Sequence, residues 1–431
     1  MAPRKRGALD GVRVLDFTWV YAGPFATRQF ADMGAEVIKV EPFGTGALER
    51  RYSLVMERNG VKQSSYHVFL NRGKKSLSIN IKTRKGLRII RELVRKSDVM
   101  ISNMAPGAMK ELGLGYEAVR RVNPRIIYCT ISCFGHYGAY ATEPGFDLIA
   151  QVASSWCGQT DPPTPAPVAI GDCNAAMHAT TAILAALYYR EKTGRGQNID
   201  ISMTDCLFHL NENNGPGYLF SGRTVPAVPN TRWAAAYAPY GLYKGKDGLI
   251  AIAALSDILW EKLVRAMGEG YEWLLTDPRT NALEVRLTYQ NAPFIHRTLE
   301  EWVAKFDSVQ QVEDLLRGAG IPAMRVRTFA EVVDAPYLRD REMLVKMEQP
   351  FVGEIEIYGS PFKMSETPGR VMGHAPLIGE HSREVLSKLL GYSNKEIDRL
   401  FAEGIIYREP AVDRLDEWFS SGERRKQTDA L

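Results

Sequence analysis

The chain has 431 residues, and its 54 lysines and arginines against 50 aspartates and glutamates give a net charge of +4. A chain of this length exceeds one ordinary hydrophobic core and indicates two or three domains. The composition, 45% hydrophobic and 24% charged, is typical of a globular protein. The near-neutral balance argues against nucleic acid as a partner, because nucleic-acid-binding proteins carry a basic stripe. With no apolar run long enough to span a bilayer, we also expect no membrane partner.

Five cysteines are present, an odd number, and none forms a C-x-x-C pair: Cys129, Cys133, Cys157, Cys173 and Cys206. This usage argues against a disulfide framework and favours a reducing compartment. The basic start "MAPRKRG" leads directly into a strand pattern, without the apolar region of a signal peptide. We therefore expect a soluble, cytoplasmic protein.

The first 210 residues alternate strand and helix patterns. Strands are expected at 12–17, 35–41, 76–81, 98–102, 125–132 and 197–203, and helices at 24–34 and 86–97. This alternation is typical of a mostly parallel, doubly wound sheet. We predict an α/β fold in which a Rossmann-like, doubly wound large domain is joined by a smaller α+β domain.

The local composition changes after about residue 222, where proline, glycine and asparagine become frequent. The pattern at 241–254 predicts a hairpin around "KGKDG", followed by helices within 257–268, 298–306 and 308–320. A strand is expected again within 353–364, then amphipathic helices at 381–391 and 393–404 with good N-cap residues. We predict a large domain from 1–222, a small domain from 223–329, and a return to the large domain from 330–431.

Several cofactor motifs are missing. The turn after the first strand, "TWVYAGPFA", has one glycine, whereas a dinucleotide fingerprint needs three. No P-loop, H-E-x-x-H or G-x-S-x-G sequence occurs, and the seven histidines are scattered. We therefore predict neither a nicotinamide cofactor nor a metal site.

Asp172 stands at the start of an apolar helix pattern, after an expected short strand and Gly171. Aspartate is among the best N-cap residues, and the pattern by itself favours that interpretation. The alternative is chemical: a carboxylate that a helix dipole keeps ionised, in apolar surroundings, can act as a covalent nucleophile. Gly171 would permit the close approach of a ligand. The local pattern leaves both interpretations open.

The segment 171–205, "GDCNAAMHATTAILAALYYREKTGRGQNIDISMTD", closely resembles the central block of the family III CoA-transferases. Further blocks at 9–46, 71–86, 102–138 and 375–406 resemble the family in the same order. The resemblance implies the family's interlocked dimer, in which each chain threads through a ring formed by the other. It leaves open a homodimer or a heteromer of related subunits.

In the family the position of Asp172 is the catalytic nucleophile. The resemblance implies that it attacks an acyl-CoA thioester, giving an aspartyl–acyl anhydride and CoA thiolate. The thiolate then forms an aspartyl-CoA thioester, from which a carboxylic acid acceptor takes CoA. The partners implied are an acyl-CoA donor and an acceptor acid, with coenzyme A as part of the substrate. Backbone N–H groups at the start of this helix are candidates to stabilise the oxyanion; a cap that binds only its own side chain is equally open.

The resemblance also implies contacts to CoA. They fall on Val20, Tyr21, Ala22, Pro42, Lys75, Ile79, Asn80, Ile81, Lys82, Asn103, Met104, Ala105, Glu111, Ser132, Cys133, Phe134, Gly135 and His136. Two of these depart from the family's charge pattern, because Pro42 and Glu111 stand where it commonly has arginine. Met104 replaces a phenylalanine, and Cys133 a glycine. The basic run 72–76, with Lys82, either offers charge for the CoA phosphates or forms a solvated face.

Other readings remain. A sister branch racemises α-methylacyl-CoA esters with a histidine as second base, but Phe146 holds that place here, which disfavours the racemase or isomerase alternative. A subunit of a heteromeric transferase is a further alternative. The family's glycine-rich loop has no counterpart, since "NTRWAAAYAPYG" stands there. Aromatic residues could line a pocket for an aryl or bulky dicarboxylic acid, or could form ordinary core: Trp19, Tyr21, Trp233, Tyr237 and Tyr240.

Overall fold

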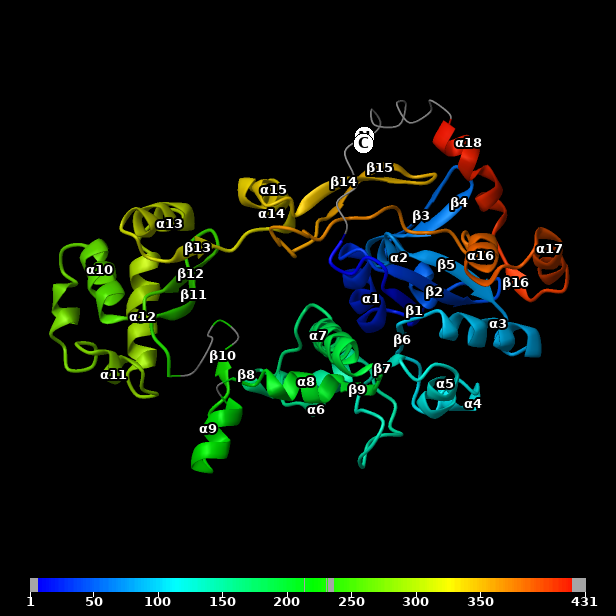
Figure 1. The fold of residues 1–431 in the computed structure, drawn as a ribbon. Helices are drawn as coiled ribbons and strands as arrows, with labels where there is room; N and C mark the ends of the chain where they lie inside the picture. Colours follow the sequence, from blue (N-terminus) through cyan, green and yellow to red (C-terminus); the bar gives the residue numbers. More distant parts are fainter. Residues whose placement is uncertain (1–6, 213, 230, 232–235, 421–431) are drawn as a thin grey trace. The chain divides into compact units, whose positions relative to one another are not determined.

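The structure, a computed structural model, describes residues 7–212, 214–229, 231 and 236–420. Its chain forms two compact units (Figure 1). The first contains the residues up to 154, then 167–209, and those from 336 onward. The second contains 155–166 and 210–335. The domain boundaries expected from the sequence remain a prediction.

A seven-stranded sheet forms the centre of the first unit, in the order β16-β5-β2-β1-β6-β7-β9. The strands are β1 (Arg13–Phe17), β2 (Glu36–Pro42), β5 (Lys75–Ile79), β6 (Val99–Ser102), β7 (Ile127–Ser132), β9 (Asn198–Ser202) and β16 (Ile406–Tyr407). All pairs are parallel except β16 with β5. This confirms the predicted doubly wound sheet. The strand order reverses between β1 and β6, which makes their carboxyl ends the switch point where such folds bind ligands.

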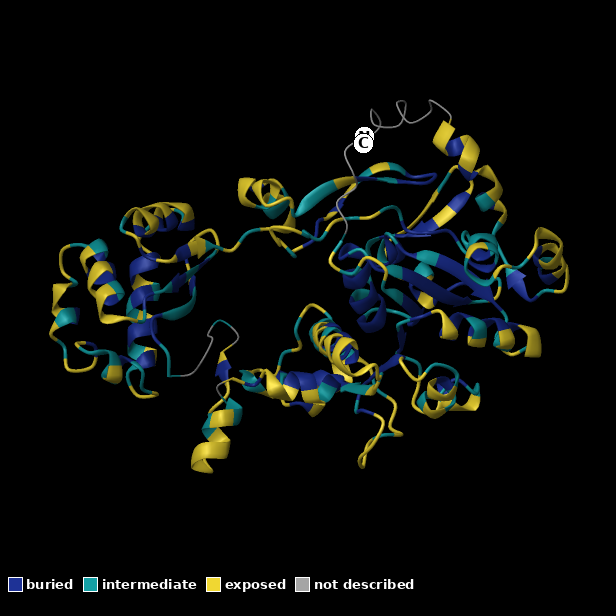
Figure 2. Cartoon of the chain, viewed as in Figure 1, coloured by how far each residue is buried: buried dark blue, intermediate teal, exposed yellow. Residues whose placement is uncertain are grey.

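One face of the sheet carries an apolar core. Leu15, Ile38 and Leu77 lie there among the buried side chains that pack with α3 (Arg84–Arg95), α5 (Tyr116–Val122) and α17 (Asn394–Ala402). Figure 2 shows the central strands of this sheet as buried. The predicted helix at 86–97 is thus confirmed, with one face buried as its periodicity requires.

The opposite face of the sheet is buried but polar. The parallel register places Asp16 beside Lys39, and Lys39 beside Ser76, and all three side chains are fully buried. This face lies towards α1 (Ala22–Asp32), whose Thr27 hydroxyl donates to Asp16. α1 in turn packs against α7 (Ile170–Thr193) and α2 (Ser65–Asn71).

The C-terminal return to the first unit differs from the expectation in one respect. The strand predicted within 353–364 forms, as β15 (Gly353–Tyr358), but it pairs with β14 (Leu344–Gln349) in a separate hairpin. The large sheet is rejoined by β16 instead. The other elements of this unit are η1 (Leu48–Arg51), β3 (Val55–Arg58), β4 (Val61–Ser64), α4 (Ala108–Glu111), α6 (Asp147–Ala153), α8 (Met203–His209), α15 (Pro336–Asp340), α16 (Ser382–Glu384), η4 (Val385–Leu389), η5 (Pro410–Arg414) and α18 (Leu415–Ser420).

The second unit is an α+β assembly around the predicted hairpin, which is confirmed as β11 (Tyr240–Lys244) and β12 (Leu249–Ala253), with β13 (Ala323–Arg325) beside it. Its apolar core includes the buried Trp260 and Trp302. The helices and remaining short strands are η2 (Cys157–Gln159), β8 (Thr160–Asp161), α9 (Asn214–Ser221), β10 (Val228–Pro229), α10 (Asp257–Met267), η3 (Glu272–Leu275), α11 (Leu283–Arg286), α12 (Ala292–Val303), α13 (Val309–Gly318) and α14 (Phe329–Val333).

All five cysteines are unpaired, and four of them are buried. In the described ranges, no helix is both long and apolar enough to cross a membrane. The same ranges contain no group of three or more His, Cys, Asp or Glu side chains placed to hold a metal ion.

Candidate active site

Asp172 lies inside the first turn of α7 and does not cap it. The helix begins at Ile170, and its N-cap residue is Ala169, which makes no side-chain hydrogen bond. The strand expected before Gly171 does not form. The cap interpretation of Asp172 is therefore wrong, because another carboxylate fills that role.

That carboxylate belongs to Asp147, the first residue of α6. Its Oδ1 accepts the backbone N–H of Gly171 at 2.6 Å and that of Asp172 at 3.2 Å. The next N–H group, of Cys173, donates to the Ala169 carbonyl at 2.9 Å. These N–H groups of the helix start are already used. The suggestion that they stabilise an oxyanion is therefore not supported by the geometry.

The carboxylate of Asp172 faces a different helix start. The backbone N–H of Ala22, the first residue of α1, acts on it electrostatically. Burial, and then the charge of Asp147, raise the pKa of Asp172 to about 7, against a partial lowering by the Ala22 N–H. A carboxylate of this kind is poorly solvated when ionised and has raised basicity, which favours nucleophilic attack.

A row of aromatic side chains extends along α1 from Tyr21. The Tyr21 side chain interacts with that of Cys173, the residue after Asp172. The Tyr21 ring lies with its centroid 5.5 Å from that of Tyr66 and 5.6 Å from that of Phe25. The guanidinium of Arg28 lies 4.4 Å from the Phe25 centroid. Spacings of four and three residues place these side chains on one face of the helix.

The loop between β1 and α1 is strained at Val20. Its φ of 64° is the left-handed region, which a β-branched residue avoids at a cost of about 1–3 kcal/mol. The Val20 N–H donates to Glu49 Oε2 at 3.0 Å. Asn103, after β6, holds the neighbouring Trp19 backbone: Oδ1 accepts the N–H and Nδ2 donates to the carbonyl, both at 2.7 Å. The loop that presents Ala22 to Asp172 is thus fixed from two sides.

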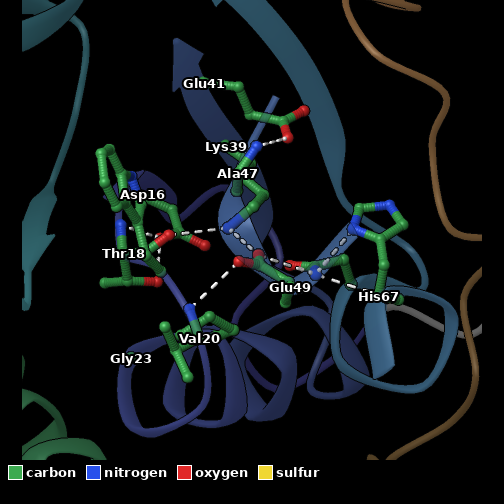
Figure 3. Close-up of polar contacts among 12 residues, drawn as sticks. Asp16, Thr18, Val20, Gly23, Lys39, Glu41, Ala47, Glu49 and His67 are labelled. Carbon is green, nitrogen blue, oxygen red and sulfur yellow. Dashed lines mark hydrogen bonds and ion pairs between the residues drawn. The ribbon is translucent and has the colours of Figure 1, made fainter. Parts of the chain in front are cut away.

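Beneath this loop lies a buried network of charges (Figure 3). Lys39 Nζ pairs with Glu49 Oε1 at 2.8 Å and donates to the Thr18 carbonyl at 2.8 Å. Asp16 Oδ1 accepts the Thr18 N–H at 2.9 Å, and its Oδ2 lies 3.2 Å from Lys74 Nζ. These four charged side chains are fully buried. Buried ion pairs of this kind add little to the free energy of unfolding, but they fix the geometry of the groups around them, here that of residues 18–20.

A cavity of about 280 Å³ opens at the carboxyl ends of β1, β2 and β5. Phe17, Trp19 and Leu112 contribute to its wall. The cavity also brings together six residues that the sequence predicted as CoA contacts: Pro42, Ile79, Asn80, Ile81, Lys82 and Met104. It therefore lies at the switch-point edge of the sheet, where doubly wound folds bind ligands.

A second cavity of about 740 Å³ shares the lining residue Met104 with the first. Its lining includes two more of the predicted contacts, Ala105 and His136, and the exposed cations Lys110 and Arg121. Met104 lines both cavities, so the two form neighbouring compartments.

The turn after β7 is shaped by its neighbours. The Cys133 sulfur occupies space that a side chain on Gly145 would need, since a Cβ there would lie 2.4 Å from it. The charges of Asp147 and Asp172 contribute, after burial, to raising the pKa of the Cys133 thiol. Ser132 ends the strand, Phe134 and Gly135 follow it in the turn, and the His136 N–H donates to Asp200 at 2.8 Å.

Other predicted contacts are placed elsewhere. Lys75 pairs with Glu36 at 2.7 Å and with Glu384 at 3.2 Å. It begins β5 four residues before Ile79, about 13 Å away along the strand. Glu111, the last residue of α4, lines neither cavity.

The basic run at 72–76 is neither a solvated face nor an open phosphate site. Arg72 is buried and pairs with Asp32 at 2.7 Å, and Lys74 is buried against Asp16. Both side chains therefore serve the interior of the fold. Lys82, by contrast, is exposed.

The sequence reading missed several residues near Asp172. Asp147 stands next to Phe146, and its place at a helix start was the available signal. Glu49, Tyr66 and Arg28 carried no local signal, because their roles come from contacts distant in sequence. Of the aromatic residues proposed for an acid pocket, Trp233 lies outside the described residues. Tyr237 and Tyr240 belong to the second unit.

Comparison with known proteins decides the family. The sequence profile of CoA-transferase family III matches residues 9–382. The chain belongs to CoA-transferase family III. It is therefore a CoA-transferase, and the resemblance seen in its sequence is confirmed.

Individual relatives of this CoA-transferase agree. It is 36% identical over 391 residues to a succinyl-CoA:mesaconate CoA-transferase of Haloarcula hispanica, covering 89% of this chain and 96% of that one. It is 32% identical to a human succinyl-CoA:glutarate CoA-transferase, covering 92% and 90%. The crystal structure of a CAIB/BAIF family protein from Brucella suis superposes with a TM-score of 0.77 at 29% identity, covering 89% of this chain and all of that one. The predicted fold class is confirmed by this likeness.

Proposed function

We propose that this CoA-transferase works by covalent catalysis on Asp172. The observation that carries the proposal is the environment of that carboxylate. It is half-buried, desolvation and the charge of Asp147 raise its pKa to about 7, and the backbone N–H of Ala22 acts on it in the opposite direction. A carboxylate nucleophile must be ionised yet poorly solvated, and this environment supplies both conditions near neutral pH.

The reaction proceeds in balanced steps. An Asp172 oxygen attacks the thioester carbonyl, a C–O bond forms, the C–S bond breaks, and the electron pair leaves on sulfur as CoA thiolate. The thiolate attacks the Asp172 carbonyl of the anhydride, forming aspartyl-CoA and releasing the first acid as its carboxylate. The acceptor carboxylate attacks this thioester and expels thiolate, which attacks the acceptor's carbonyl and regenerates ionised Asp172. No external proton or electron is consumed.

The start of α1 assists the charge that develops on Asp172. Ala22 is the first residue of that helix, so its N–H carries the positive end of the helix dipole. When CoA thiolate or the acceptor attacks the Asp172 carbonyl, the oxygen facing Ala22 becomes an oxyanion. A backbone donor held rigidly in a water-poor site stabilises such a charge.

The two cavities beside Met104 suit the CoA moiety. The smaller one, walled by Trp19, Pro42 and Ile79, offers apolar and aromatic surface for a flat ring. Lys82 at this cavity, and Lys110 and Arg121 at the larger one, supply cations for phosphates. These cations would replace the arginines that the family commonly has at the positions of Pro42 and Glu111.

We propose a dicarboxylic acyl group, with succinyl-CoA as donor. The curated relatives named above take CoA from succinyl-CoA, and mesaconate and glutarate are dicarboxylic acids. Arg28 offers a cation for the distal carboxylate. Its Nε is buried without a hydrogen-bond partner, and among the described residues no carboxylate lies within ion-pair distance of it. That guanidinium lies 4.4 Å from the Phe25 ring centroid, and the Phe25 ring contacts that of Tyr21.

The interlocked dimer also remains a proposal. It is supported by large apolar side chains that are exposed on α6, α7 and α8 and next to them: Phe146, Leu148, Ile149, Val152, Met177, Tyr188, Tyr189 and Phe208. Exposed apolar groups this numerous favour coverage by a second copy. The five unpaired cysteines support the proposed cytoplasmic location.

The test is a transfer assay on the purified full chain. Succinyl-CoA is supplied with a panel of mono- and dicarboxylic acids, and new thioesters are separated by chromatography. We expect transfer to dicarboxylic acids by the chain alone and none by Asp172→Asn. Failure of every donor and acceptor, with deuterium uptake at the α-carbon of a 2-methylacyl-CoA, would overturn the proposal in favour of the racemase. Activity that requires a second, different chain would favour the heteromeric alternative.

A further inference from the structure

Asp147 holds the start of the helix that carries the nucleophile. Its Oδ1 accepts the N–H groups of Gly171 and Asp172 at 2.6 and 3.2 Å. Its Oδ2 accepts the side-chain N–H of Gln151, one turn further along α6, at 2.7 Å. The Gln151 side chain is itself buried. Three donors therefore fix both oxygens of this one carboxylate.

The glycine before the nucleophile is explained by the same contact. A Cβ on Gly171 would lie 2.9 Å from Asp147 Oδ1 and 3.2 Å from Leu207 Cδ1. Gly171 is helical and has an ordinary φ, so the requirement is space and not conformation. The carboxylate of Asp147 is built into the packing of α6 against α7.

Asp147 also sets the local charge. Titratable side chains from several elements act on one another around Asp172: Asp147 of α6, Tyr21 at the start of α1, Tyr66 of α2, Cys133 after β7 and Cys173 of α7. The cation Arg28 of α1 acts on Tyr21 and Cys173. Among these neighbours of Asp172, Asp147 is the one that carries a carboxylate. Two carboxylates in one water-poor site repel each other when both are ionised.

We propose that Asp147 is a positioning residue for the nucleophile: it caps α7 at Gly171 and Asp172, and its fixed negative charge destabilises ionised Asp172 relative to the covalent intermediates. The inference rests on the proposed function of Asp172. In the free enzyme the charge of Asp147 acts on ionised Asp172. When Asp172 attacks the thioester, its negative charge passes to the leaving sulfur, and the anhydride and the aspartyl thioester are both neutral at Asp172. The repulsion is relieved on acylation.

Asp147→Asn separates the cap from the charge. The asparagine oxygen can still accept the two backbone N–H groups, so the fold and the melting temperature should be retained. Activity requires the ionised form of Asp172, so kcat should increase as the pH is raised past the pKa of Asp172. Without the neighbouring charge that pKa falls, and we expect the acid limb of the kcat profile to move about one pH unit lower. On the plateau above it, kcat should fall about tenfold, because the repulsion no longer favours acylation.

Gly171→Ala is the second variant. It keeps both charges but forces Asp147 away from the helix start, so its acid limb should move in the same direction. Asp205→Asn, on the neighbouring α8, is the matched control and should keep the wild-type profile. Wild-type pH profiles and kcat in both Asp147→Asn and Gly171→Ala, with Asp172→Asn inactive, would overturn this inference and leave the proposed function standing. An active Asp172→Asn would instead overturn the proposed function itself.

Discussion

The side-chain amide of Asn103 makes two hydrogen bonds with the backbone of Trp19: Oδ1 accepts the N–H and Nδ2 donates to the carbonyl, each at 2.7 Å. The family resemblance assigns Asn103 to CoA, but in this chain both polar atoms of its side chain bind the loop that leads to Ala22. The contact joins the end of β6 to the loop after β1, across the switch point of the sheet.

Asn103→Ala should therefore act on the chemical step more than on CoA binding. The freed loop can relax from the strained conformation at Val20, and Ala22 then moves away from Asp172. We expect kcat to fall about tenfold or more, as small misplacements at a reacting centre do, with a smaller change in the KM for the acyl-CoA. Steady-state kinetics check this. A large rise in KM with an unchanged kcat would show that Asn103 contacts CoA.

Glu49→Gln tests the buried pair beneath the same loop. The variant keeps an acceptor for the Val20 N–H but leaves Lys39 buried without its partner, which should lower the free energy of unfolding by about 3–5 kcal/mol. The double variant Glu49→Gln with Lys39→Met should recover most of the lost stability and remain active. The double variant Lys39→Met with Glu49→Leu should be as stable but poorly active, because the Val20 N–H has lost its acceptor. Urea unfolding and transfer assays measure both; equal activity in the two double variants would contradict the account.

The charge of Asp172 should weaken the fold at neutral and alkaline pH. Its pKa is raised to about 7 in the folded protein from 3.8. For a carboxyl group with a raised pKa, the stabilising contribution is complete below the unfolded value and is lost as pH rises through the folded value. Asp172→Asn should therefore be more stable than wild type at pH 8, by on the order of 2 kcal/mol, and the difference should fade towards pH 4.

Urea unfolding at a series of pH values checks this prediction. Asp314→Asn, on an exposed face of α13, is the control and should show no such trend. A difference between Asp172→Asn and wild type that does not depend on pH would mean that the Asp172 pKa is ordinary.

Lys82 tests the proposed CoA site, and Lys75 is its matched control. Both come from the segment that the sequence associated with CoA, but Lys82 lines the switch-point cavity and Lys75 is ion-paired with Glu36 at the other end of β5. Lys82→Ala should raise the KM for the acyl-CoA several-fold with little change in kcat, and the rise should shrink at high salt. Lys75→Ala should leave that KM unchanged. The reverse order of effects would place the phosphates elsewhere.

Arg28→Gln tests the substrate class. Loss of the guanidinium should reduce kcat/KM for dicarboxylic acids by about tenfold or more, as expected for a partly buried charge pair. Monocarboxylic acids of the same length should be affected less, and Arg28→Lys should be intermediate because the lysine keeps a cation but not the planar fork. An equal loss for both classes of acid would show that Arg28 supports the fold and not the recognition of a second carboxylate.

The sheet could be predicted from the sequence because its strands are short, apolar and regularly alternated with helices. The predicted strands at 12–17, 35–41 and 98–102 all form, within about two residues of their expected bounds. The burial of their polar side chains is harder to predict. Lys39 and Glu41 alternate with valine and isoleucine, as in a half-exposed strand, yet both faces of β2 are buried.

The site was predictable in part. Asp172 was found through the family blocks, and the cavity contacts Ile79 and Asn80 through the same resemblance. The place of Asp147 at a helix start was a local signal, but nothing local shows that it caps a second helix, which begins more than 20 residues later. The roles of Lys75 and Asn103 also depend on partners far away in sequence, Glu384 and Trp19, which no local pattern reveals.

The covalent role of Asp172 is tested most directly by trapping its intermediate. The purified chain is mixed with succinyl-CoA in the absence of an acceptor, treated with hydroxylamine or borohydride, digested, and analysed by mass spectrometry. We predict a modification on the peptide that contains Asp172, confined to that carboxylate and absent from Asp172→Asn. An unmodified Asp172 peptide from enzyme that is actively transferring CoA would contradict the account.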